Sequence, residues 1–147
     1  MKEKEWEKLL RIKTTGRDDT RSDTFRYPYE PTSYEVLERL TNTGLISKNN
    51  TLLDYGCGKG RVSIFMAYQT KCHSIEIFKS VLANIIDSYY EAQREMLIMC
   101  YYPSDEYLMC LSQEYNVTFV EEIDCSDVSD GEAAREKIVV YRVGEGE

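Results

Sequence analysis

The stretch Thr51-Leu52-Leu53-Asp54-Tyr55-Gly56-Cys57-Gly58-Lys59-Gly60-Arg61-Val62 decides how the chain folds. Its apolar start is typical of a buried strand, its alternating glycines of a tight turn, and the residues after Gly60 of a helix. Glycine lacks a Cβ, so the turn can take positive φ and bring its N–H groups close to a ligand. The free N–H groups of the following helix point to the same place. The stretch predicts a binding loop, and a turn that binds nothing is the simpler alternative.

Two common nucleotide-binding motifs do not fit these glycines. A dinucleotide fingerprint requires a glycine or alanine at its last position. That position is Arg61 when the motif starts at Gly56, and Ser63 when it starts at Gly58. A P-loop requires a glycine five residues before its Gly-Lys pair, and Leu53 occupies that position. Both motifs are excluded.

An acid followed by alternating glycines resembles the first motif of class I S-adenosylmethionine (SAM) dependent methyltransferases. In that family the acid supports the methionine amine of the cofactor, and the glycine backbone lies against the adenosyl and methionine portions. The resemblance implies that SAM is the cofactor. It also implies contacts from the loop residues Asp54, Gly56, Cys57, Gly58 and Gly60.

The resemblance extends to positions before and after the loop. In the family an acid at the end of the second strand holds the ribose hydroxyls, and Glu76 is the acid available there. A carboxylate suits this role because it accepts two hydroxyl hydrogen bonds side by side. The segment 27–40 resembles the leader of one bacterial group of predicted methyltransferases, which implies that Tyr29, Glu30 and Thr32 line the pocket. The alternative is that the tyrosines of this leader are packing anchors.

The predicted architecture is an α/β, Rossmann-like class I methyltransferase fold with a shortened, mostly parallel sheet and a C-terminal antiparallel hairpin. We expect one domain over residues 1–147, with an N-terminal helix and arm at 1–31 and an α/β body at 32–147. Apolar and β-branched runs predict the strands. These runs are 51–56, 72–77, 95–102, 117–124 and 137–143. Compared with the family, the third and fourth strands are missing.

Apolar spacing and capping residues predict the helices. A helix over 2–13 carries Trp6, Leu9 and Leu10 on one face, followed by a polar arm over 14–26 that could serve as a lid. Thr32 is the predicted N-cap of the next helix, and Ser104 that of a later one. Further helices are expected after Gly60 and from Phe78 onward.

The missing middle leaves three functional hypotheses. The first is a SAM-dependent methyltransferase, acting on an unknown acceptor, in which a second copy completes the sheet as a dimer. The second is a truncated, non-catalytic protein that binds SAM or its product S-adenosylhomocysteine (SAH). The third is an interaction domain that uses Tyr101, Tyr102 and Tyr107, which equally suit the wall of an adenine pocket or plain core. The family's acceptor-facing Asn-Pro pair is absent from the sequence, so no catalytic residue is assigned.

The composition of the chain limits the kinds of acceptor, metal and membrane partner that we expect. The formal net charge of −8 repels polyanions, so a small molecule or a protein is favoured over nucleic acid as the acceptor. Five scattered cysteines and the single His73 predict neither a disulfide framework nor a metal site. The charged start and the lack of a long apolar run predict a soluble, cytoplasmic protein without a membrane segment.

Overall fold

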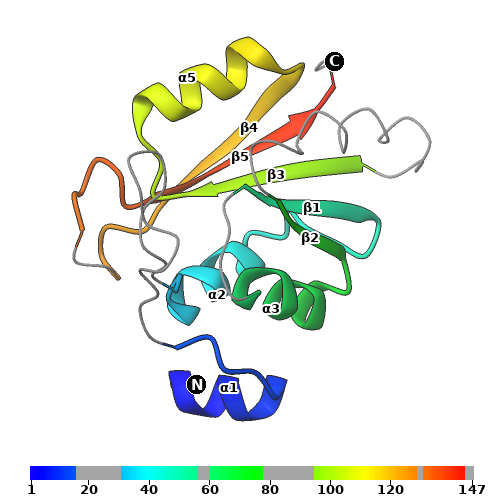
Figure 1. Ribbon diagram of the computed structural model, residues 1–147, viewed down its shortest axis with the longest axis vertical. Coiled ribbons are helices and arrows are strands. Elements are labelled where there is room, and N and C mark those ends of the chain that lie inside the picture. The colour runs from blue at the N-terminus through cyan, green and yellow to red at the C-terminus, as the bar shows by residue number, and fades with distance from the viewer. Residues whose placement is uncertain (16–30, 56–59, 78–94, 129–130, 145–147) are drawn as a thin grey trace.

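The computed structural model describes residues 1–15, 31–55, 60–77, 95–128 and 131–144, with the backbone alone at Tyr55, Glu76 and Ile77 (Figure 1). Five strands form one sheet in the order β2-β1-β3-β5-β4. The strands are β1 (Asn50–Tyr55), β2 (His73–Ile77), β3 (Glu95–Tyr101), β4 (Val117–Asp124) and β5 (Lys137–Val143). Each coincides with a predicted strand to within one residue at either end, so the apolar runs located the strands correctly.

The predicted Rossmann-like, mostly parallel sheet is wrong. β1 pairs in parallel with β2 and with β3, but β5 pairs antiparallel with both β3 and β4. Half of the strand pairings are therefore antiparallel, and the sheet is mixed. The reason lies in β5, whose consecutive side chains Ile138, Val139 and Val140 are all buried. A strand covered on both faces belongs in the interior of a sheet, so β5 inserts between β3 and β4.

Helices cover both faces of this sheet (Figure 1). Helices α1 (Glu3–Leu10), α2 (Tyr34–Asn42) and α3 (Arg61–Thr70) lie on one side, and α5 (Asp105–Glu114) lies on the other. Successive residues of β1 divide between two cores: Leu52 packs with the α2 and α3 side chains, and Leu53 with Leu111 of α5. β1 is thus buried on both faces and paired on both edges. Its outer neighbour β2 is an edge strand of the described sheet, so β1 lies beside an unpaired edge, as the missing strands predict.

The helix starts show where capping residues were predicted correctly. Ser104 caps α5 by accepting a hydrogen bond from the Tyr107 N–H at 3.2 Å, as predicted. The N-cap of α2 is Ser33, which accepts from the Val36 N–H, so the predicted cap Thr32 is wrong by one residue. In α1, Trp6 is buried but Leu9 is 46% exposed, which corrects the prediction that Leu9 faces inward.

Among the described residues, no helix has the length and apolar character needed to cross a membrane.

Candidate functional site

Two of the predicted cofactor residues meet at the carboxyl edge of the parallel strands. Asp54, near the end of β1, is the register partner of Glu76 in β2 and of Met99 in β3. β1 continues into α3 on one face of the sheet, and β3 continues into α5 on the opposite face (Figure 1). In sheets with parallel strands, ligands bind at the carboxyl ends where the chain diverges in this way. Asp54 lies at such a point.

The helix that follows the predicted loop begins with the glycine geometry expected of it. Gly60 is the N-cap of α3, and its φ is +90°, in the left-handed region that disfavours side chains. The predicted contacts Gly56, Cys57, Gly58, Tyr29 and Glu30 lie outside the described residues. Gly60 is therefore the described end of this loop.

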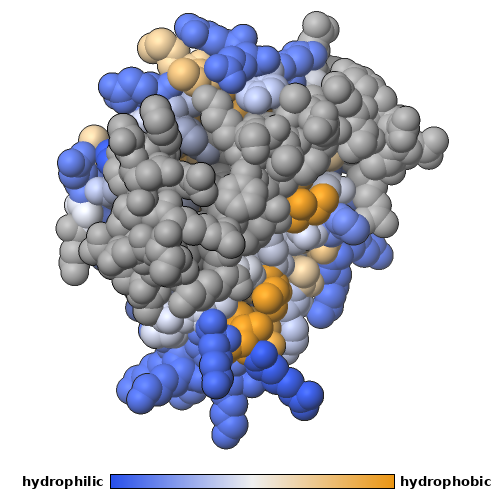
Figure 2. Space-filling view, viewed as in Figure 1, coloured by the Kyte–Doolittle hydropathy of each residue, from blue (hydrophilic) through white to orange (hydrophobic). Residues whose placement is uncertain are grey.

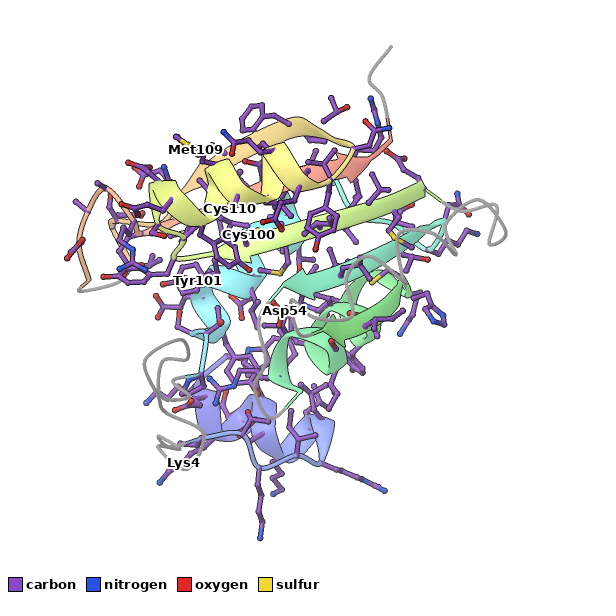
Figure 3. All side chains as sticks on the ribbon, turned by 45° about the horizontal axis from the view of Figure 1, so that its top comes forward. Lys4, Asp54, Cys100, Tyr101, Met109 and Cys110 are labelled. Carbon is purple, nitrogen blue, oxygen red and sulfur yellow. The ribbon has the colours of Figure 1, made fainter. Side chains whose placement is uncertain are left out.

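The charge of Asp54 affects a thiol on the neighbouring strand β3. Burial, and after it the negative charge of Asp54, raises the pKa of the Cys100 thiol on β3. Figure 3 shows Asp54, Cys100 and Tyr101 at the ends of these adjoining strands. Cys100 is 1% exposed, so its thiol stays protonated and the residue packs as part of the hydrophobic core.

Arg61, the first residue of α3, carries a buried cation that the sequence prediction missed. Its side chain is 3% exposed, and its Nη2 lies 2.6 Å from a carboxylate oxygen of Glu3. Its Nε donates to the Thr14 hydroxyl at 2.7 Å, and its Nη1 donates to the carbonyl of Thr32 at 3.0 Å. The guanidinium also lies over the ring of Tyr34, 4.4 Å from the centroid. Thr32, a predicted wall residue, is thereby placed beside the start of α3.

Glu7 is the second acid of this cluster, 3.7 Å from the Arg61 guanidinium. It accepts hydrogen bonds from the Tyr34 hydroxyl and from both the backbone and the hydroxyl of Thr14 and Thr15. Burial acts to raise the pKa of Glu7, but these hydrogen bonds outweigh it, and the pKa is lowered from 4.5. Glu7 is therefore ionised at neutral pH and balances the charge of Arg61.

A buried acid that immediately precedes β5 lies beside the end of β3. Glu136 is 4% exposed, accepts the Tyr101 hydroxyl at 2.5 Å, and accepts the Gly131 N–H at 3.0 Å. Tyr101 packs on the core beneath α2 and α3, whereas Tyr107 packs on the core beneath α5. These two tyrosines lie on opposite faces of the sheet, so they do not form one aromatic wall.

Among the described residues, no group of three or more His, Cys, Asp or Glu side chains could hold a metal ion. The site thus offers carboxylates, backbone groups at a glycine-started helix, and a neighbouring buried arginine.

Comparison with protein-family models, curated proteins and solved structures gave no match for this chain.

Proposed function

We propose that the carboxyl edge of β1 binds SAM and that the chain transfers its methyl group to an acceptor. The observation that carries the proposal is the register of Asp54 with Glu76 on adjacent parallel strands, next to an α3 that starts at Gly60. Because the sheet as a whole is mixed, its topology does not support the proposal. The support comes from this local arrangement and from the sequence motif.

Each residue has a role that its chemistry suits. Asp54 accepts hydrogen bonds from the methionine amine of the cofactor, and the carboxylate of Glu76 accepts both ribose hydroxyls. Glycines before α3 let the backbone approach the cofactor closely. The bound cofactor would supply an electrophilic methyl group on a sulfonium. The protein's task is then to hold an acceptor in line with that group, which needs positioning more than acid or base chemistry.

The second candidate is a non-catalytic protein that binds SAM or SAH. The contacts of Tyr101 favour this non-catalytic candidate. Tyr101 lies near the proposed site, two positions beyond Met99, the register partner of Asp54 on β3. Its hydroxyl donates to the buried Glu136, and its ring packs on the core. Such a residue anchors the strand end, and it is poorly suited to face an acceptor.

The proposed setting is the cytoplasm, with a small molecule or a protein as the acceptor because of the net charge of −8. A dimer remains a prediction, although it is not needed to pair β1, which lies between β2 and β3. Within the described sheet the edge strands are β2 and β4. A second copy that extends the sheet would pair with one of these edge strands. Analytical ultracentrifugation measures whether the protein is a monomer or a dimer.

The test of transfer uses SAM labelled in its methyl group, incubated with the purified protein and fractionated cell extract. Label entering the protein or small-molecule fraction, and lost with Asp54→Ala, supports a methyltransferase. Glu114→Ala is the matched control, because Glu114 is an exposed acid at the last residue of α5, which returns the chain to the opposite edge of the sheet. Cofactor binding without label in any fraction would favour the non-catalytic candidate.

A further inference from the structure

Arg61 connects the proposed cofactor site to the N-terminus of the chain. In the sequence it follows Gly60, the N-cap of α3. Its side chain donates hydrogen bonds to Glu3, Thr14 and Thr15 in the first fifteen residues, where Glu7 also lies 3.7 Å away. Its remaining contacts are the Thr32 carbonyl and the Tyr34 ring. The position of the N-terminal segment and the order of the first turn of α3 are thus linked through one side chain.

The electrostatics of this position require the N-terminal acids. The N-terminus of a helix carries a positive partial charge, so a buried cation there is unfavourable. A buried arginine without an acid beside it is also strongly destabilising. Glu3 and Glu7 supply the compensating charge from α1. Undocking of α1 would remove both acids from Arg61 and so weaken the anchor of the first turn of α3.

α1 is a short helix that depends on its contacts with the body. It has eight residues, and helices this short are not stable on their own in water. Most side chains on its outer surface are hydrophilic, as the lower end of the molecule in Figure 2 shows, although Leu9 is also exposed. A groove of ≈ 640 Å³ between α1 and the start of α2 reaches Arg61. The main apolar contact between α1 and the body is made by Trp6, which packs against Tyr34 and Phe65.

We propose that α1 together with Thr14 and Thr15 is a latch whose docking is coupled to ligand binding at the carboxyl edge of β1. This inference rests on the proposed cofactor site. Docking of the latch orders the first turn of α3 and so prepares the site, while a bound cofactor orders the same turn and favours docking. The coupling is reciprocal by thermodynamic necessity. The N-terminal segment thereby regulates cofactor affinity.

The protein contains its own reporter of docking. Trp6 is the single tryptophan of the chain, is 6% exposed, and donates its indole N–H to Glu38 at 2.9 Å. Acrylamide quenching of its emission measures undocking of α1, and calorimetry with SAH measures cofactor affinity. The test variant is Glu7→Gln, and the matched control is Lys4→Gln on the solvent side of the same helix (Figure 3).

The latch predicts that Glu7→Gln increases the quenching of Trp6 and weakens SAH binding by about tenfold, and that saturating SAH restores protection. Lys4→Gln leaves both unchanged. If Glu7→Gln exposes Trp6 but binds SAH with wild-type affinity, the latch is overturned and the cofactor proposal stands. If Trp6 stays protected, the acids do not hold α1 and the latch is again overturned. If the wild-type protein does not bind SAH, both proposals fall. Thr14→Val, which removes one hydroxyl from the cluster, replaces Glu7→Gln if that variant does not fold.

Discussion

The guanidinium of Arg61 lies 2.6 Å from the carboxylate of Glu3, a residue 58 positions away in the sequence. Because Arg61 is 3% exposed, its removal leaves Glu7 without its nearby cation and breaks three further hydrogen bonds. We expect Arg61→Ala to lower the free energy of unfolding by about 3 kcal/mol, measured by urea denaturation. The matched control is Arg39→Ala, which breaks an exposed pair with Asp127 and should change stability far less. Equal losses would contradict the structural role of Arg61.

The lowered pKa of Glu7 predicts a pH dependence with a definite sign. A carboxyl whose pKa is lower in the folded than in the unfolded protein stabilises the fold above its unfolded pKa. This stabilisation is lost as pH falls below the usual 4.5 and through the folded pKa. Glu7→Gln should therefore be less stable than wild type at pH 7, with the difference shrinking toward pH 3. A difference that is constant from pH 7 to pH 3 would contradict the account.

Gly131 is required for space. A Cβ at this position would meet the Glu136 carboxylate and the Tyr102 ring at far less than van der Waals separation. We expect Gly131→Ala to cost about 1 to 3 kcal/mol by overpacking, measured as a lower urea midpoint. Gly44→Ala is the comparison, because a Cβ there meets nothing within 4 Å and only its positive φ opposes substitution. A fully stable Gly131→Ala variant would show that Glu136 is not held as described.

The cysteines should differ sharply in reactivity. Burial raises the pKa of the Cys100 thiol, and also those of Cys72 and Cys125, whereas Cys110 is exposed on α5. Of these four, iodoacetamide should alkylate Cys110 alone in the native protein, and all four after unfolding. Peptide mass spectrometry distinguishes them. Rapid native labelling of Cys100 would mean that α5 does not cover β3.

Local signals in the sequence were enough to locate the strands and several helix starts. The run Glu95–Tyr101 is apolar because β3 is buried on both faces, and this pattern survives in any sheet order. Sheet order depends on contacts between distant residues, such as Ile98 with Tyr141. The buried run in β5 indicates an interior strand, but it does not specify which strands flank β5 or in which direction they run, and the prediction of a Rossmann-like sheet was wrong for this reason.

The site was predicted only in part. Asp54 and Glu76 were chosen as candidates because a strand-end acid is a local signal; the register shows their backbones to be neighbours, and their role in binding a cofactor stays a prediction. Arg61 was missed because its partners come from residues 3–15 and 32, far away in the sequence. One signal was present: an arginine opening a helix runs against the helix dipole. A buried arginine at a helix start needs a nearby acid to balance its charge. Glu3 and Glu7, which are one helical turn apart, supply that charge.

The central claim is that Asp54 belongs to a cofactor site, and isothermal titration of the purified chain with SAH tests it most directly. The account predicts saturable binding of one SAH per chain, lost in Asp54→Ala and retained in Glu114→Ala. Absence of binding by the wild-type protein, or binding by Asp54→Ala with wild-type affinity, would contradict it.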